Sequence, residues 1–473
     1  MFGWGSVRAR LGCSCVVAIV LCALVVPARA DAGPERARAT PARASDDPPA
    51  SISRRPVPDY DGRPDSARSP VASAVWVPRV LLFPAYLVFE RFVRFPLGRV
   101  ARWAEENDVP RRVVRFFRFG PEQRLTLAPI WTYELGFRPS IGALFRARGL
   151  GSARHHLTTT ASFGGRRWYA GRVIDTFSPP GSRWRLRMES LALSRPDRLY
   201  AGLGPAIEPD KKARYHEVAA HAAVSARRRL RRQSSLALGT GYRYRRFNND
   251  VGDRISIADS IASGALDALP PGFAEGYSLW FVEVQLALDT RKRALPSTKS
   301  GYRLEGRATT AFDLRDGPTA QSFALYGGAM TGFIDLSGAG HMLKLMTSAV
   351  FSDAFSGQVP FTELPALSGA GPLGGFSRGY LTGDSGVALS VTYTWPVSLY
   401  IDGRLSFALG NVFDGHLAGF APDRLRMSPS AGFTLSVPGI QVAEVSLGLG
   451  TDEFGDRPNV ESVRVFVGSS HAF

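Results

Sequence analysis

The sequence is poor in cysteine, and beyond residue 30 it has no apolar run long enough to cross a membrane as a helix. The three cysteines are Cys13, Cys15 and Cys22, so the rest of the 473 residues can form no disulfide. The best remaining apolar run, residues 80–89, has ten residues, whereas a spanning helix needs about 20. These absences exclude a disulfide framework and a helical membrane domain, but they do not exclude a membrane protein made of strands.

The first 30 residues have the pattern of a cleaved secretion signal. Arg8 and Arg10 precede a nearly unbroken apolar stretch over residues 11–26, and Ala28-Arg29-Ala30 supplies the small residues of a cleavage site. We therefore expect an exported chain whose mature form starts near Asp31. Without disulfides such a chain needs another source of stability. A closed barrel provides one, because all its backbone polar groups pair between strands.

Acidic residues are the minority: 41 Asp and Glu stand against 58 Lys and Arg, which gives a net charge of +17. A basic balance often indicates nucleic acid. Export points instead to anionic lipid or lipopolysaccharide, so we expect these partners and no nucleic acid.

The chain divides by composition into four parts. Residues 1–30 are the signal, and residues 31–75, rich in Pro, Arg, Ala and Asp, read as a disordered linker because they have few large apolar side chains. Residues 76–121 interleave apolar and basic positions, which predicts a short amphipathic helical segment in the periplasm; a small plug on the barrel mouth is the alternative. Residues 122–473 form the outer-membrane domain.

That last part alternates with a period of two, the pattern of β-strands. In residues 388–397 the odd positions are apolar and the even ones small or polar. Charged residues recur on the second face, aromatic residues gather near strand ends, and long connections alternate with short ones, which favours a membrane barrel over a sandwich. We expect an all-β antiparallel barrel of about 16 strands. We expect a row of basic residues to face the lumen, which we call the basic lumen row: Arg183, Arg185, Arg187 and Arg243. This row either makes the lumen selective for anions or is paired internally.

Four segments of residues 122–473 resemble the BamA/TamA family, also called the bacterial surface antigen family. The first is an Arg-Gly-Tyr loop motif at Arg378, Gly379 and Tyr380, and the second a hairpin motif at Asp289, Thr290, Arg291, Pro296 and Gly301. The third is SFALGNVFD over residues 406–414, and the fourth a C-terminal insertion signal with Gly468 and Phe473.

The resemblance implies a sixteen-stranded barrel whose sixth extracellular loop folds into the lumen and carries Arg378 with it. In the family, that arginine meets carboxylates on the next two strands. This chain departs from the pattern, with Thr392 and Ala408 at the two positions. An arginine inside a barrel needs acceptors, so we expect Asp402 or Glu283 as its partner, with Glu305 as a further candidate and Asp402 favoured.

A second departure concerns function. No periplasmic POTRA pattern precedes the barrel, so the chain resembles a barrel-only member. The expected function is outer-membrane assembly or translocation of a polypeptide or lipid. The alternatives are a passive anion-permeable pore or structural surface antigen and, below these, an outer-membrane enzyme. We expect no enzyme activity, cofactor or metal site, because the adjacent His155 and His156 face opposite sides of a strand and no nucleophile motif stands out. Its own insertion would need the barrel assembly machinery.

Overall fold

The structure is a computed structural model that describes residues 103–469, apart from residues 104–105, 108, 151, 153, 207–211, 292–299, 316–319, 337–339, 438–439 and 456–458. The expected signal and linker lie outside the described residues, as do most of the segment 76–121, Pro296 and Phe473. The boundaries predicted for those parts therefore stay predictions.

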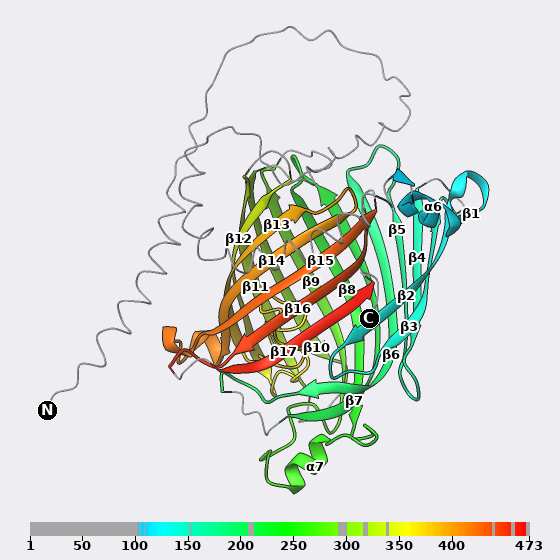
Figure 1. Cartoon of the computed structure of the whole chain (residues 1–473). Helices are drawn as coiled ribbons and strands as arrows, with labels where there is room; N and C mark the ends of the chain where they lie inside the picture. The colour runs from blue at the N-terminus through cyan, green and yellow to red at the C-terminus, as the bar shows by residue number, and fades with distance from the viewer. Residues whose placement is uncertain are drawn as a thin grey trace, which may run out of the picture. The chain divides into compact units, whose positions relative to one another are not determined.

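Sixteen antiparallel strands close into a barrel, in which each strand pairs with the next along the chain and β17 returns to pair with β2 (Figure 1). The first eight are β2 (Leu125–Glu134), β3 (Ser140–Arg148), β4 (His155–Phe163), β5 (Tyr169–Phe177), β6 (Trp184–Tyr200), β7 (Ala213–Arg229), β8 (Ser235–Asn248) and β9 (Tyr277–Asp289). The others are β10 (Gly301–Asp313), β11 (Ser322–Asp335), β12 (Met342–Ser356), β13 (Ser385–Pro396), β14 (Ile401–Phe413), β15 (Arg426–Val437), β16 (Ile440–Thr451) and β17 (Val460–Ser469). The predicted fold class is confirmed.

The alternation read from the sequence separates the two faces of the wall. Leu286, Leu304 and Leu447 are each at least 40% exposed on the outside, as expected for a face that meets lipid. The residues that alternate with these leucines along the strands face the lumen. There Glu283 pairs with Arg307. The register is continuous over most strand pairs, which fixes each side chain on one face.

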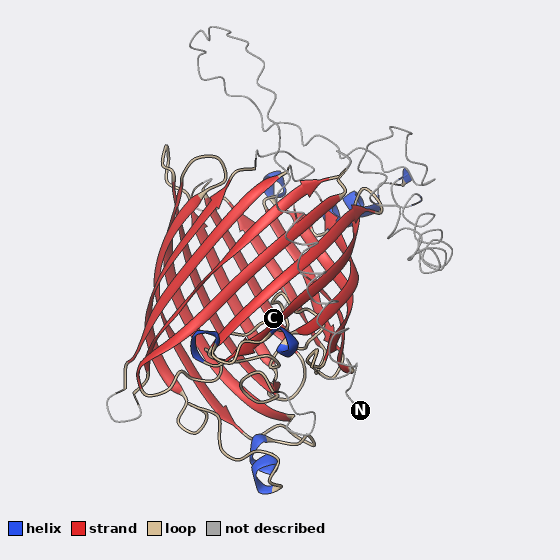
Figure 2. Ribbon diagram, turned by 90° about the vertical axis from the view of Figure 1, so that its left-hand side faces the viewer, coloured by secondary structure: helices blue, strands red, loops and turns tan. Residues whose placement is uncertain are grey.

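The two ends of the barrel differ in the length of their connections. Short turns join β3 to β4, β5 to β6, β7 to β8 and β13 to β14, and we call this the turn end. The opposite, long-loop end carries residues 249–276, 357–384 and 414–425. The first of these contains helix α7 (Ile257–Ala262), which lies beyond the strands in Figures 1 and 2. Its N-cap, Ser256, forms a capping box with Asp259.

A short helix, α6 (Val109–Phe116), and a two-residue strand, β1 (Arg118–Phe119), precede the barrel at the turn end. Three single 3-10 turns complete the described elements: η2 (Pro121–Gln123), η4 (Gly415–Leu417) and η5 (Pro422–Arg424). Within the part of the chain that the structure covers, no helix is long and apolar enough to cross a membrane.

The connection of residues 357–384 folds into the lumen, as the resemblance implied, and we call it the inward loop. Its residues Leu373, Phe376 and Leu381 are at most 1% exposed. They pack in one apolar cluster with wall residues of β6, β13 and β14, namely Leu199, Ala388, Ala408 and Val412. The loop therefore contacts wall strands that lie far apart around the barrel.

Candidate functional site

The closure between β17 and β2, which we call the seam, is the shortest strand pairing of the barrel in the described residues. Only three residue pairs form it: Phe466 with Glu134, Val467 with Tyr133, and Gly468 with Thr132. Neighbouring ladders such as β16–β17 have nine pairs and β2–β3 has eight. Because each pair in a ladder adds backbone hydrogen bonds and side-chain contacts, the described part of the seam has fewer such interactions than the other strand pairings of the wall.

Pro129 limits how far the seam can extend along β2. The odd residues Leu127 and Leu135 direct their N–H groups to this edge, where they donate to Phe117 O at 2.9 Å and Val465 O at 3.0 Å. Pro129 has the same parity but no N–H, so it can donate nothing here. Within sheets, proline is found mainly at edges, at the first residue of a strand or at bulges. The edge of β2 that faces β17 therefore lacks a hydrogen-bond donor at position 129.

The rest of the same edge is occupied by the segment before the barrel. In β1, Arg118 pairs with Thr126 and Phe119 with Leu125. The edge of β2 is therefore shared between the N-terminal segment at the turn end and β17 nearer the long-loop end. An open strand edge is otherwise free to pair with another chain.

An ion pair crosses the seam on the lumen side. Arg464 of β17 donates from Nε to Glu134 Oε1 of β2 at 2.8 Å, and both side chains are less than 15% exposed. Arg464 also lies 3.4 Å from the carbonyl oxygen of Gly374 in the inward loop. The loop and the seam are thus joined through one arginine.

Glycines let the inward loop lie against β16. A Cβ on Gly375 would overlap the backbone of Leu449, and a Cβ on Gly450 would meet the ring of Phe376. The Gly375 N–H donates to Ser428 Oγ of β15 at 2.7 Å. The alternating glycines of β16 form a groove in which Gly375 and Phe376 sit.

The predicted motif residues Gly379 and Tyr380 hold the other side of the loop. Gly379 has φ +102° and lies so close to Leu199 of β6 that a side chain would overlap the Leu199 carbonyl. Its own carbonyl accepts from the N–H of Ala201 at 3.2 Å. The Tyr380 ring is 7% exposed and lies 5.9 Å from that of Phe376. Sequence reasoning found these residues; it did not find the receiving strand, β6.

The structure places Arg378 in the lumen but not with the partners expected for it, so both pairings are wrong. Glu283 instead accepts from Arg307 Nε at 2.6 Å. Asp402 lies at the start of β14, at the turn end of the barrel. The side chain of Arg378 makes no hydrogen bond or ion pair with any residue that the structure describes. Glu305, the further candidate, pairs with Arg303 at 2.6 Å.

The surroundings of Arg378 are cationic. Its side chain is exposed to the lumen and lines a cavity together with Arg198, Arg245 and Glu217. The like charge of Arg198 and the opposite charge of Glu217 both act on this guanidinium. Glu217, on β7, is the carboxylate of this neighbourhood. Nothing in the sequence HEVAA around Glu217 indicates this role.

Apolar packing occupies the positions where the family pattern has carboxylates. Ala408 is fully buried in the cluster beneath the loop, and Thr392 shares a 3.0 Å hydrogen bond with Ser406. A charged residue at position 408 would have to enter that cluster. In this chain the inward loop is therefore held by apolar burial, close backbone contact and hydrogen bonds, without an ion pair to Arg378.

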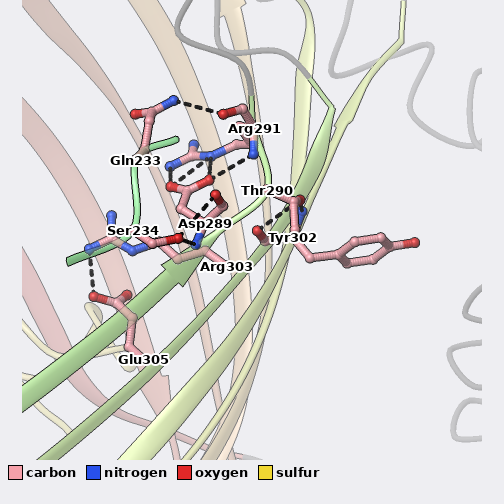
Figure 3. Close-up of polar contacts among 8 residues, drawn as sticks. All are labelled: Gln233, Ser234, Asp289, Thr290, Arg291, Tyr302, Arg303 and Glu305. Atoms are coloured by element: carbon pink, nitrogen blue, oxygen red, sulfur yellow. Dashed lines mark hydrogen bonds and ion pairs between the residues drawn. The ribbon is translucent and has the colours of Figure 1, made fainter. Parts of the chain in front are cut away.

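The hairpin motif forms a compact junction at the turn end (Figure 3). Asp289 accepts from Arg291 Nε at 2.9 Å and from its terminal nitrogen at 2.6 Å, a bidentate pair. Thr290 and Tyr302 exchange hydrogen bonds of 3.0 and 2.8 Å between β9 and β10. Gly301 has φ +153° and packs against Arg291. These contacts give the motif a structural role.

Two of the four arginines of the basic lumen row are internally paired, and Arg183 and Arg185 are exposed. Arg187 contacts Glu189 at 2.7 Å and Arg243 pairs with Glu363. At the C-terminal signal, Gly468 lies at the seam, where a side chain would come 2.9 Å from the Phe466 ring. Phe473 is outside the described residues, so its role stays a prediction.

Three polar side chains on adjacent strands form a chain that sequence reasoning did not find. Ser194 Oγ lies 2.8 Å from His216 Nε2, and His216 Nδ1 lies 3.2 Å from Asn248 Oδ1. This is the order of a nucleophile, a base and an orienting group. However, Ser194 is 2% exposed, its hydroxyl also lies 2.7 Å from Arg167 O, and the cavity beside it is about 10 Å³. Such a space holds about one water, so the chain as built serves to join strands.

No cluster of potential metal ligands occurs in the described part of the chain. Neither family models nor curated proteins match the sequence. Among solved structures, BamA from Haemophilus ducreyi lacking POTRA domains 1–3 is similar over 73% of this chain and 70% of its own, with 14% identity and a TM-score of 0.51. The chain also matches CdiB from Acinetobacter baumannii and from Escherichia coli, with 11% and 12% identity and TM-scores of 0.45 and 0.47.

The two CdiB matches extend over 73% and 72% of this chain. They extend over only 59% and 62% of the CdiB chains themselves. The similarity to BamA concerns the fold alone. The shared fold is the closed antiparallel barrel described above. The chain therefore has the barrel fold of BamA.

Proposed function

We propose that this protein is an outer-membrane barrel that assembles or translocates another envelope molecule by parting its first and last strands. The observation that carries the proposal is the seam: three residue pairs, an edge proline at position 129, and a neighbouring segment on the same edge. Opening there would expose strand edges onto which a polypeptide strand could pair. It would also open a path from the lumen to lipid.

Export by the predicted signal and the apolar outer face support an outer-membrane location, with the turn end in the periplasm and the long-loop end outside. The partners would be outer-membrane lipid and lipopolysaccharide, with the barrel assembly machinery needed for the chain's own insertion. The BamA-like fold supports an assembly or translocation role. We propose no enzymatic step and no cofactor.

A disulfide across the seam tests the proposal. Tyr133 and Val467 lie opposite each other, and no cysteine occurs after residue 22, so the double variant Tyr133→Cys/Val467→Cys introduces a single cross-link. The control Leu447→Cys/Val465→Cys locks the β16–β17 ladder, whose register is already continuous there. We expect only the seam lock to abolish complementation of a deletion strain, scored by its outer-membrane composition, with recovery under reductant. Full complementation by the oxidised seam lock would refute strand parting.

The alternative, a passive anion-permeable pore, is disfavoured by the inward loop, whose buried apolar residues pack against both β6 and β14 inside the lumen. Conductance of the purified barrel in planar bilayers separates the two functions. A steady anion-selective current in the unmodified protein would favour the pore. Rare openings that the seam disulfide suppresses would favour parting strands.

A further inference from the structure

A cavity of about 120 Å³ lies inside the barrel between β6, β7, β8 and the inward loop. Arg198, Arg245 and Arg378 line it together with a single carboxylate, that of Glu217. Because roughly 10–15 Å³ of such space holds one water, the cavity would take several waters or one small anion. It is far larger than the water-sized space beside Ser194.

The carboxylates of this region are already engaged. Glu217 accepts from Arg198 Nε at 2.6 Å with one oxygen and pairs with Arg245 through the other. Glu363 pairs with Arg243, lies 3.4 Å from Arg245 Nε and accepts from the Tyr277 hydroxyl at 2.6 Å. The two side chains are 2% and 4% exposed, so neither has an oxygen free for a further cation.

Positive charge is therefore in excess. Among the described residues, four guanidinium groups, those of Arg198, Arg243, Arg245 and Arg378, face two carboxylates, which leaves a net charge of +2. Arg378 has no ion-pair partner in the described structure, whereas Arg245 is paired with both carboxylates and lacks only a hydrogen bond at Nε. Unpaired cations inside a protein are costly and call for an anion.

We propose that this cavity binds a phosphate group, with Arg378 as its principal ligand and Arg198 and Arg245 beside it. A dianionic phosphate matches the excess of charge, whereas a carboxylate would neutralise only half of it. The planar guanidinium fork suits phosphate oxygens, and three arginines can serve different oxygens at once. Binding would join the inward loop to β6, β7 and β8. The inference does not depend on whether the seam opens.

Titration calorimetry of the full chain in detergent tests the proposal, with sodium phosphate added to a chloride buffer at constant ionic strength. We expect one saturable site, weakened at least tenfold by Arg378→Ala and less by Arg378→Lys, which keeps the charge but loses the fork. Arg307→Ala is the matched control, since Arg307 is a lumen arginine paired with Glu283. It should leave binding unchanged.

The source of the phosphate group is distinguished by a second arm, in which lipopolysaccharide is added before inorganic phosphate. Competition would assign the site to a glycolipid phosphate, and its absence to free phosphate. No saturable heat from the unmodified chain would overturn the proposal, whatever the variants do. Equal affinity in Arg378→Ala and the unmodified chain would overturn it as well.

Discussion

Glu217 is the residue whose removal should damage the lumen most. Its side chain is 2% exposed, and its two oxygens hold Arg198 and Arg245. Glu217→Ala leaves both arginines without this acceptor inside the barrel. Arg378, which has no ion-pair partner among the described residues, lies nearby and adds a third positive charge to the same region.

The magnitude follows from the fate of each arginine. Removing one partner of a buried ion pair costs about 3–5 kcal/mol. Arg245 keeps its 3.4 Å contact with Glu363, so the loss should fall within that range and not double it. Arg378→Ala leaves the ion pairs of the carboxylates intact and removes the repulsion between Arg378 and its neighbours Arg198 and Arg245. We therefore expect the free energy of unfolding to change by at most about 0.5 kcal/mol. Adding it to Glu217→Ala should recover part of the loss.

Urea unfolding in lipid vesicles, followed by heat-modifiable migration on gels, measures these free energies in a phosphate-free buffer. Glu283→Ala is the control, because its partner Arg307 is 61% exposed and such a pair contributes about 1 kcal/mol or less. If Glu217→Ala cost no more than this control, or if Arg378→Ala cost as much as Glu217→Ala, the assignment of charges in the lumen would be wrong.

Three further predictions concern other parts of the barrel. Gly375→Ala should destabilise the inward loop by about 1–3 kcal/mol in the same assay, because a Cβ there overlaps Leu449. The control Gly374→Ala should be neutral, since a Cβ at that position meets nothing within 4 Å. Equal effects of the two substitutions would count against the groove. Ser194 should resist labelling by a fluorophosphonate probe, and labelling that Ser194→Ala abolishes would instead reveal a nucleophile. The pKa of Asp259 is lowered by its hydrogen bonds to Ser256, so the capping box stabilises α7 above the ordinary pKa of 3.8 and loses this effect as pH falls through the lower folded value. The protection of the α7 amides relative to their intrinsic exchange rates should fall over that acidic range in the unmodified chain, and this fall should be absent in Ser256→Ala.

The barrel could be predicted from the sequence because its signals are local. Alternation with a period of two in residues such as 388–397 places side chains on two faces, and the rhythm of long and short connections gives the two ends. The inward loop was implied by the family resemblance that the Arg-Gly-Tyr motif carries, and Gly379 has a positive φ and lies close to Leu199. Such features depend on neighbours along the chain or on one conformational requirement.

The partners of Arg378 could not be predicted, because they depend on which strands the loop reaches across the lumen. The sequence favours Asp402 because it lies on the same strand as Ala408. Asp402 is six residues before Ala408 on β14, so it lies nearer the turn end of the barrel. Glu217 lies 161 residues before Arg378 in the chain, and nothing in its surrounding sequence indicates that the two share a cavity. The Ser194, His216 and Asn248 chain was missed for the same reason, since its members meet only through strand register.

The central claim is that the β17–β2 seam is the weakest line of the barrel wall. Hydrogen exchange of the folded chain in lipid tests it most directly, by comparing the seam amide of Leu135 with those of residues 143–145 in the continuous β3–β4 ladder. We predict that the seam amide exchanges at least tenfold faster and that the Tyr133→Cys/Val467→Cys disulfide slows it to the rate of the control ladder. Equal protection of the two sites in the unmodified chain would contradict the claim.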